Sequence, residues 1–533
     1  MENFVQNPSS FHLVVGNLCN FLTISEIKFL SVLTKEWKAV TDPIISKKCP
    51  LKIDKSNVGK FESFTRRYER FRVQEIPTSQ VENLLAHLIK NQSDDLKNGR
   101  RKQYPKVLMF IKVVMTENTL KLLKDLEYIE ELLIYSCNMD FSGELENIDL
   151  NMSLKKLVCT VKSYHESRVF HQLLNSNKLS LRNIKICIDY DIESNMCEDD
   201  GSLKTLDDIH FPNLEAVTVN YETLNFKRFF RNNSQLKSFT MHFTTVPKGV
   251  IEALQEYCPD LENLSVDGCE TEAEDDVLNI YKVEKLSVLK LTGSLKVNFA
   301  NLNFEKLETF ANDNITPQIL LSILPKMKNL KYLDLSCLQY YQHDCVLSSE
   351  LLSAISVACP KLERLLLLRN PGINNNLDPS KFKPFAKLEN YNFNMTDLKD
   401  ELLFCLATPR LWKAQLHATC ITDAGLSYLA NNCPLLEKVY IGNCDSITDE
   451  GVSYLVENLV NLRYLCIQYC AQLTSSSFKT ILAKKLLSAN VSGMEIKDIE
   501  ESHEYMENEG DKILIKNGYR CITIDFYKKY KVM

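Results

Sequence analysis

The chain of 533 residues lacks the short motifs that mark common catalytic and nucleotide-binding sites. It has no Gly-x-Gly-x-x-Gly, no phosphate-binding loop, no His-Glu-x-x-His, no Gly-x-Ser-x-Gly and no kinase signature. The one compact group of reactive residue types, His343-Asp344-Cys345, lies in a predicted loop, where adjacent residues rarely share a catalytic geometry. We therefore expect a protein that is not an enzyme and holds no cofactor or metal.

The sequence also lacks an excess of positive charge. Its 63 Lys and Arg residues are outnumbered by 69 Asp and Glu residues, which gives a formal net charge of −6. A protein that neutralises nucleic-acid phosphates needs a basic surface, so no nucleic-acid partner is expected. Two local basic clusters, at residues 66–72 and 100–102, are interpreted as solvated faces.

Targeting and disulfide signals are missing as well. No signal-peptide pattern follows Met1, and no apolar run is long enough to cross a bilayer. The 18 cysteines include no Cys-x-x-Cys pair, so zinc-ribbon spacing is absent. These absences predict reduced thiols in a cytoplasmic or nuclear protein without a membrane partner.

What the sequence does contain is an internal repeat. Residues 421–444 and 447–470 align without a gap at an offset of 26 residues and are identical at 11 of 24 positions. In each copy an Ile-Thr-Asp turn can cap a helix with an amphipathic stripe. An L-x-x-L-x-L run follows, whose alternating apolar residues predict a short strand with one buried face. Strand plus helix in about 25 residues predicts a parallel-stranded solenoid.

The same pattern can be followed back along the chain. Gaps between copies vary in length, which predicts inserted loops. Good matches to the strand start occur at Leu214, Leu236, Leu261, Leu286, Leu307, Leu330, Leu362, Leu388, Leu411, Leu436, Leu462 and Leu486, and weaker ones at Leu108, Ile129, Leu154, Leu181 and Tyr519.

Several copies resemble the cysteine-containing class of leucine-rich repeats. The resemblance rests on the Cys-Pro-x-Leu-Glu runs that begin at Cys258, Cys359 and Cys433. A second set of residues lies eight positions after a strand start, where an inward side chain can meet backbone groups as the chain turns away: Cys137, Cys269, Asn370, Cys444 and Cys470. All are interpreted first as core residues, because a free Cys behaves as a small buried hydrophobe.

A separate apolar segment, residues 11–40, precedes the repeats. Its two helical stripes predict short helices that make a poor core by themselves, so the segment needs a partner. It resembles an F-box. The residues that occupy the family pattern without a gap are Leu22, Glu26-Ile27, Ser31, Leu33 and Lys35-Glu36-Trp37, whereas Ser10-Phe11 replaces the usual Leu-Pro, Leu13 a common acidic residue and Thr34 a common Cys.

An F-box followed by cysteine-type leucine-rich repeats is the order found in substrate adaptors of SCF-type cullin–RING ubiquitin ligases. The resemblance implies a fold and three segments. The fold is an α/β leucine-rich-repeat horseshoe solenoid with a small all-α F-box-like module. The segments are the module at residues 8–50, a connecting segment at 51–104 and the solenoid at 105–533.

The resemblance also implies partners. The N-terminal helices would dock on a Skp-type linker subunit, and through it on a cullin, while the repeats hold a protein substrate for ubiquitin-dependent degradation. The residues expected to supply this docking, or to hold the helices to each other, are Leu18, Leu22, Ile27, Leu30, Leu33 and Trp37.

Two other functions fit parts of the sequence. A leucine-rich-repeat scaffold that binds and inhibits or tethers a protein needs no ubiquitin ligase, and the missing Leu-Pro favours it. An extracellular repeat receptor is disfavoured because the signal peptide and disulfide-capped flanks are absent. Co-purification with the linker subunit separates the first two alternatives.

The substrate is expected on the concave face of the sheet, where alternate strand residues point. In the later repeats these residues are polar or aromatic and include no carboxylate, which suits an acidic or phosphorylated segment. Earlier strands place Asp267 and Asp334 there, so the face changes sign along its length. The expected contact residues are Arg364, Asn390, Asn392, Asn394, Lys413, Gln415, His417, Lys438, Tyr440, Tyr464 and Gln468.

The repeat register makes a direct prediction at Val439, the middle apolar residue of its run. Val439→Asp would bury an unpaired charge and should lower the free energy of unfolding by several kcal/mol. Thermal denaturation of the purified variant measures this. A melting temperature equal to that of the unchanged chain would show that the register is wrong.

Overall fold

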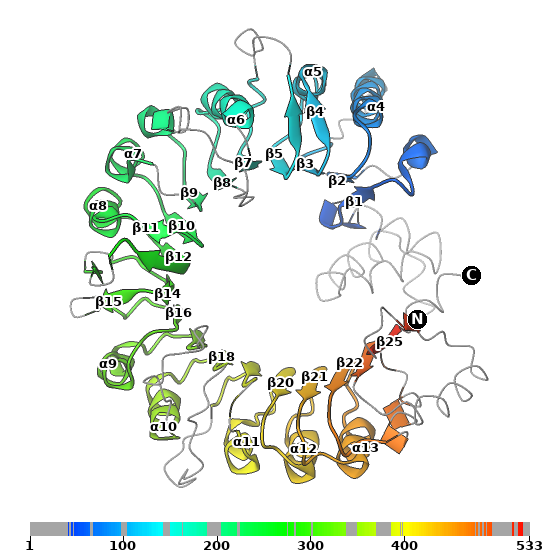
Figure 1. The fold of residues 1–533 in the computed structure, drawn as a ribbon, viewed down its shortest axis with the longest axis vertical. Coiled ribbons are helices and arrows are strands. Elements are labelled where there is room, and N and C mark those ends of the chain that lie inside the picture. The colour runs from blue at the N-terminus through cyan, green and yellow to red at the C-terminus, as the bar shows by residue number, and fades with distance from the viewer. Residues whose placement is uncertain are drawn as a thin grey trace, which may run out of the picture. The chain divides into compact units, whose positions relative to one another are not determined.

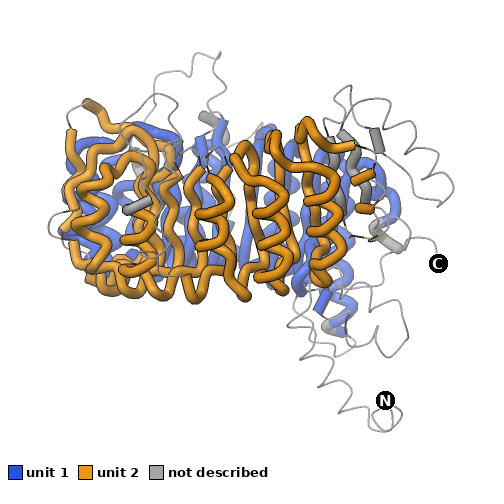
Figure 2. Tube along the Cα trace, turned by 90° about the horizontal axis from the view of Figure 1, so that it is seen from below, with its two compact units in different colours: residues 1–260 blue, residues 261–533 orange. Residues whose placement is uncertain are grey.

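The computed structural model (Figure 1) divides into two compact units, residues 1–260 and 261–533, coloured separately in Figure 2. The linker-docking residues Leu18–Trp37, the His343-Asp344-Cys345 trio and Asn370 lie outside the described residues. The structure describes residues 41, 44–45, 47–63, 68–97, 104–141, 150–162, 164–188, 204–220, 224–273, 276–281, 284–299, 302–336, 349–368, 385–394, 396, 398–474, 476–477, 480–481, 484, 486, 488–492, 514–515 and 521–525.

The first unit is built on a parallel sheet whose strand order follows the chain. Strands β1, β2, β3, β5, β7, β8, β9 and β10 pair successively in parallel, and β4 pairs with β6 in a small separate sheet. The strand bounds are β1 (Leu51–Ile53), β2 (Arg70–Gln74), β3 (Val107–Ile111), β4 (Val114–Thr116), β5 (Glu131–Tyr135), β6 (Asn138–Asp140), β7 (Lys156–Val161), β8 (Asn183–Ile188), β9 (Ala216–Val219), β10 (Ser238–His242) and β11 (Thr245–Val246).

Helices cover the other side of this sheet, so that strands line one side of the unit and helices the opposite side (Figure 1). They are η2 (Val58–Ser63), α4 (Thr78–Lys97), α5 (Glu117–Lys124), α6 (Tyr164–Ser176), η4 (Lys204–Asp208), α7 (Phe226–Asn232) and α8 (Val250–Tyr257). The core lies between the two layers.

The second unit repeats this plan. Its sheet runs β12, β14, β16, β17, β18, β19, β20, β21, β22 and β23 in parallel, after which β25 and β24 add antiparallel strands. The strands are β12 (Asn263–Thr271), β13 (Val277–Asn279), β14 (Val288–Ser294), β15 (Lys296–Asn298), β16 (Thr309–Asn312), β17 (Tyr332–Asp334), β18 (Arg364–Leu366), β19 (Asn390–Asn392), β20 (Lys413–His417), β21 (Lys438–Gly442), β22 (Tyr464–Gln468), β23 (Ser488–Ser492), β24 (Leu514–Ile515) and β25 (Cys521–Asp525).

Its helices again lie on one side of the sheet (Figure 1). They are α9 (Pro317–Ile323), η5 (Leu324–Lys326), α10 (Ser349–Ala358), α11 (Asp400–Leu406), α12 (Asp423–Asn432) and α13 (Asp449–Asn458). Each unit is therefore a solenoid of strand–helix repeats with the leucine-rich pattern, as the sequence predicts.

The predicted register is confirmed wherever the leucine signal is strong. At every start from Leu214 to Leu486 the strand begins two residues after the leucine. Within β21 the apolar residues Val439 and Ile441 are 0% and 1% exposed, whereas Lys438 and Tyr440 are half-buried on the other face. Burial of one face of each strand against its helix supplies the apolar stabilisation of the repeat.

The structure differs from the sequence expectation in three places. The segment 51–104, expected as a connector, contributes β1 and β2 to the sheet of the first unit. Leu108 pairs with Leu132, so it is the middle buried residue of its strand rather than the start. The strand expected after Tyr519 exists as β25 but runs antiparallel to β23, because alternation of apolar residues is the same in either direction.

A common geometry ends the strands. The residue after the last strand position has a positive φ at Glu75, Lys112, Ser136, Phe243, Ala418, Asn443 and Tyr469, with values between 48° and 53°. The next residue is often the expected inward Cys. Its thiol points back to the carbonyl two residues earlier, at 3.4 Å for Cys137, 3.5 Å for Cys269, 3.3 Å for Cys444 and 3.6 Å for Cys470.

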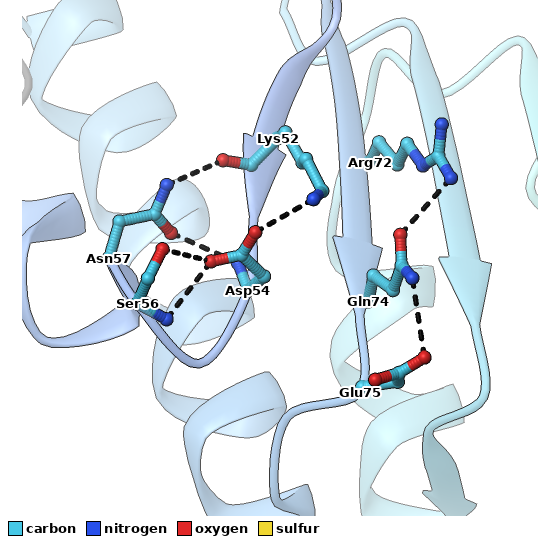
Figure 3. A network of polar contacts seen from close by, with 7 residues as sticks. All are labelled: Lys52, Asp54, Ser56, Asn57, Arg72, Gln74 and Glu75. Atoms are coloured by element: carbon cyan, nitrogen blue, oxygen red, sulfur yellow. Dashed lines mark hydrogen bonds and ion pairs between the residues drawn. The ribbon is translucent and has the colours of Figure 1, made fainter. Parts of the chain in front are cut away.

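Polar side chains organise the edge of the first unit around β1 and β2 (Figure 3). The Asp54 carboxylate accepts hydrogen bonds from the hydroxyl and backbone N–H of Ser56, and it pairs with Lys52 at 2.9 Å. These contacts lower the pKa of Asp54 to about 2. On β2, Arg72 donates to Gln74, which donates to Glu75 at the strand exit.

In the second unit an aspartate of one repeat accepts hydrogen bonds from a threonine of the next, an arrangement called the aspartate relay here. Asp400 accepts from both the N–H (3.0 Å) and hydroxyl (2.6 Å) of Thr422, and Asp423 accepts from those of Thr448 at 2.9 and 2.6 Å. Asp449 repeats the pattern with Thr474. Thr422 and Thr448 are also the N-caps of α12 and α13, so each capping residue is held by the aspartate of the preceding repeat.

In the first unit a buried asparagine plays a comparable role. Asn177 is 1% exposed and donates to the carbonyls of Leu150 and Leu173, both at 2.8 Å. Its carbonyl oxygen accepts from the N–H groups of Met152 and Leu154. All four hydrogen-bonding positions of this amide are therefore satisfied.

Asn177→Ala should be strongly destabilising, because it leaves the Leu150 carbonyl and the N–H groups of Met152 and Leu154 without their side-chain partner. We expect a loss of roughly 3 kcal/mol or more in the free energy of unfolding. Asn175→Ala, two residues earlier in α6 and exposed, is the matched control and should change it by less than about 0.5 kcal/mol. Denaturant unfolding compares the two, and equal effects would contradict the role assigned to Asn177.

Candidate protein-binding face

The side of the second unit's sheet that faces away from the helices is called the inner face here. Parallel register aligns its residues in rows across neighbouring strands. One row joins Arg364, Asn390, Lys413, Lys438 and Tyr464 from β18 to β22. A second row, two residues further along each strand, joins Asn392, Gln415, Tyr440 and Cys466. The sequence expectation therefore brings these residues onto one continuous surface.

Aromatic rings hold the two lysines of the first row. The Lys438 ammonium lies 4.7 Å from the ring centre of Tyr464 and 5.4 Å from that of Trp412. Lys413 lies 5.4 Å from the ring centre of Tyr440. Each cation–π contact contributes roughly 0.5–1 kcal/mol at such partly exposed sites and fixes the position of the charge. Trp412 was missed by the sequence analysis because it precedes β20 by one residue.

The three cations of this face are Arg364, Lys413 and Lys438. Within the described residues, no ion pair involves Arg364, Lys413 or Lys438. Partial burial lowers the pKa of Lys413, and the neighbouring charges of Lys438 and Arg364 lower it further. Lys413 thus lies near two other cations, and none of the three forms an ion pair among the described residues, which favours binding of an external anion.

At the C-terminal end of these strands, polar contacts join His417 to Asn394 and Asn443. The backbone N–H of His417 donates to Oδ1 of Asn394 at 2.9 Å, and Nδ2 of Asn443 lies 3.1 Å from Nε2 of the His417 ring. Burial lowers the pKa of His417. Gly442 makes room for the imidazole, since a Cβ there would lie 2.0 Å from its Nδ1. Gln468 ends β22 beside this group.

Asn392 differs from its neighbours. It is 8% exposed, so the expectation that it is open to a partner is wrong. Its side-chain oxygen accepts the N–H of Asn394 at 3.1 Å, which turns the amide back toward the chain. Asn390, Asn394, Gln415 and Gln468 are half-buried.

The beginning of the second unit carries acidic groups on the same face. Asp313 accepts the N–H of Gly293 with both oxygens, at 2.9 and 3.0 Å. Burial raises the pKa of Asp313 to about 6, and the carboxylates of Asp334 and Asp267 add to the rise. Asp334 accepts from the Tyr332 hydroxyl at 3.1 Å. The predicted carboxylates thus lie on the earlier strands, together with Lys290 of β14, whose ammonium lies 5.7 Å from the ring centre of Tyr332.

In the first unit the corresponding face carries an apolar cluster between charged residues such as Lys156 and Lys185. Val107, Leu133 and Val158 form a buried cluster there, with Met109 and Tyr135 packed against it. A cavity of about 530 Å³ lies at the N-terminal ends of β2, β3 and β5. Its lining includes Val107 and charges of both signs, among them Arg70, Lys106, Glu69, Glu130 and Glu131.

Burial keeps the thiols of three repeat cysteines protonated. Burial raises the pKa of Cys258, Cys359 and Cys433 to about 12, which keeps these thiols protonated and unreactive. Among the described residues, no group of three or more His, Cys, Asp or Glu side chains is placed to hold a metal ion. None of the helices in the described segments is long and apolar enough to cross a bilayer.

Comparisons with known proteins bear on the fold only. No family model and no curated protein matches the chain. Among solved structures, it is similar to the yeast Rad7–Elc1 complex, with 17% identity and a TM-score of 0.42 over 75% of this chain and 85% of that one.

Two further solved structures show weaker sequence identity. The TLR13–ssRNA13 complex has 13% identity and a TM-score of 0.44 over 81% of this chain, which spans 56% of the TLR13 chain. An internalin of Listeria monocytogenes has 12% identity and a TM-score of 0.29 over 70% of this chain and 80% of that one. At these TM-scores the likenesses carry no inference about partners.

The raised pKa of Asp313 makes a pH prediction. Its folded pKa of about 6 lies above the ordinary value of 3.8, so the folded state binds the proton more tightly. Protonation should therefore stabilise the fold as the pH falls through 6, and this gain is absent at neutral pH. Asp313→Asn should remove it.

The measurement is the melting temperature at about pH 7.5 and about pH 5. At the higher pH the melting temperature of Asp313→Asn should lie above that of the unchanged chain. On acidification the variant should not show the gain in melting temperature that protonation of Asp313 gives the unchanged chain. Asp445→Asn, an exposed carboxylate in the same unit, is the control and should follow the unchanged chain. Identical pH responses in all three proteins would contradict the assignment.

Proposed function

We propose that this protein is a non-catalytic substrate-recognition adaptor of a cullin–RING ubiquitin ligase. In this proposal the inner face of β18–β22 captures an acidic segment of a protein substrate. The observation that carries it is the row of Arg364, Lys413 and Lys438, aligned by strand register and free of any ion pair among the described residues.

The electrostatics of this row support an anionic ligand. Lys413 carries a lowered pKa because it is partly buried near two other cations. A carboxylate or phosphate placed beside it would relieve that repulsion and form charge-assisted hydrogen bonds. The aromatic partners Trp412, Tyr440 and Tyr464 hold the ammonium groups in place, so less conformational freedom is lost on binding.

The link to a ubiquitin ligase rests on the F-box-like sequence of residues 8–50. In the proposal Leu18, Leu22, Ile27, Leu30, Leu33 and Trp37 pack together and against a Skp-type linker subunit, which joins the chain to a cullin. The adaptor then acts by proximity: it raises the effective concentration of substrate lysines near a ubiquitin-charged enzyme. Such an assembly belongs in the cytoplasm or nucleus.

A second candidate function is a repeat scaffold that tethers or inhibits its bound protein without a ligase. The specific observation in its favour is Ser10-Phe11 in place of the Leu-Pro that begins the F-box pattern. Both functions use the same binding face. They differ only in whether the N-terminal segment binds the linker subunit.

The experiment compares affinity-purified full-length chain with two altered forms by quantitative mass spectrometry. The first lacks residues 8–40. This deletion spares Leu51–Ile53, because β1 pairs with β2 and belongs to the repeat sheet. We expect it to lose the linker subunit and cullin but to keep substrate proteins. Retention of the linker subunit by a folded deletion protein would exclude the F-box assignment.

The second form is the triple variant Arg364→Ala, Lys413→Ala, Tyr440→Ala. It should keep the linker subunit and lose substrate affinity by roughly tenfold or more, since buried Arg and Tyr contacts dominate many interfaces. The control is Lys156→Ala with Lys185→Ala, which removes two positive charges from the same face of the first unit. An unchanged partner list for the triple variant would place the substrate elsewhere.

A further inference from the structure

Two large aromatic side chains occupy left-handed backbone positions at strand exits. They are Phe243, with φ 48°, after β10, and Tyr469, with φ 53°, after β22. A side chain with a Cβ is disfavoured in this region, and bulky residues are especially uncommon there. Within the second unit a positive φ is found at Gly268 inside β12, at Ala418 after β20 and at Asn443 after β21, which are all smaller residues than tyrosine.

Packing within the described residues does not explain why a tyrosine occupies the left-handed position at 469. Its side chain is 52% exposed, and among the described residues it makes no hydrogen bond, ion pair or ring contact. Phe243, 76% exposed, differs because its ring stacks on that of His242 with the centroids 6.3 Å apart. A residue that keeps an unfavourable backbone conformation and adds nothing to the core is a candidate for contact with a partner.

Tyr469 adjoins the proposed binding face. It directly follows Gln468, the last residue of β22, and β22 begins with Tyr464, which holds the Lys438 ammonium. Lys438 pairs with Tyr464 in the strand register, so Tyr469 lies five residues along the strand from the level of the two lysines. At about 3.3 Å per residue this separation is roughly 16 Å.

We propose that Tyr469 is an apolar anchor of this face. The captured acidic segment carries an aliphatic or aromatic side chain, about five extended residues from its carboxylates, and this side chain packs on the Tyr469 ring. The inference rests on the proposed acidic-segment binding. Tyrosine suits the role because a rigid ring buries a large area at low entropic cost and is enriched at interfaces.

The geometry also orients the bound segment. The carboxylates lie over the lysine row at the start of β20 and β21, and the apolar residue lies at the strand exits. The segment therefore runs along the strands rather than across them.

The experiment uses fluorescein-labelled synthetic peptides and the full-length chain. Each peptide is a Gly-Ser sequence of about 14 residues with a central run of glutamates. In one pair a leucine lies about five residues before or after the glutamates. In the matched peptides alanine replaces that leucine. Fluorescence anisotropy gives the dissociation constants, and thermal denaturation reports on folding.

The unchanged chain should bind one leucine peptide up to about tenfold more tightly than its alanine counterpart, as expected for burial of an aliphatic side chain. Tyr469→Gly should bind both peptides with the affinity of the alanine peptide, without a fall in melting temperature, because glycine accepts the positive φ. Phe243→Gly, the same change at an exposed strand exit of the first unit, should keep the leucine preference.

The possible failures are distinguishable. If the unchanged chain binds the glutamate peptides without any leucine preference, the anchor is overturned and the acidic-segment proposal stands. A leucine preference that persists in folded Tyr469→Gly also overturns the anchor. If no glutamate peptide binds, acidic-segment binding itself is wrong, and the anchor falls with it.

Discussion

Each repeat depends on the parallel backbone register that it shares with its neighbour. The pairing of Lys438 with Tyr464, and of Val439 with Leu465, sets which residues enter the core and which form the inner face. Because side chains alternate along a strand, the register that buries Val439 also aligns Lys438 with Lys413. A shift by one residue would move the leucines to solvent and the cations into the core. The candidate binding face and the hydrophobic core are thus both set by the strand register.

The two units use that constraint for different surfaces. In the first, the inner face carries the apolar cluster of Val107, Leu133 and Val158. In the second, the equivalent positions hold Asp267, Lys290 and Asp334 on the earlier strands, and cations beside tyrosines on the later ones. The helices do not dictate this difference, because inner-face side chains point away from them. The inner-face side chains can therefore differ between repeats while the leucine pattern of the repeat stays the same.

Much of the fold could be predicted from the sequence, because leucine spacing and period-two alternation act locally. Every strand start from Leu214 to Leu486 follows from them. The signal fails where another residue replaces the leading leucine: Tyr68 and Pro105 stand two residues before β2 and β3. Direction is also invisible, so β25 was expected to be parallel. On the candidate face, alternation predicts Lys413, Lys438 and Tyr440. It does not predict the buried amide of Asn392, the ring of Trp412 beside Lys438 or the left-handed backbone of Tyr469, which depend on neighbouring repeats.

The hydrogen bonds between aspartates and threonines limit how the array can be lengthened. They join Asp400 to Thr422, Asp423 to Thr448 and Asp449 to Thr474. Each repeat offers an acceptor to the repeat that follows and a donor to the one that precedes. A duplicated copy of the 26-residue segment would arrive with both halves of this connection, so insertion of one whole period leaves no capping group orphaned. Insertion of a partial period would break the chain of donors and acceptors. Lengthening by whole repeats would therefore preserve the helix caps of this part of the protein.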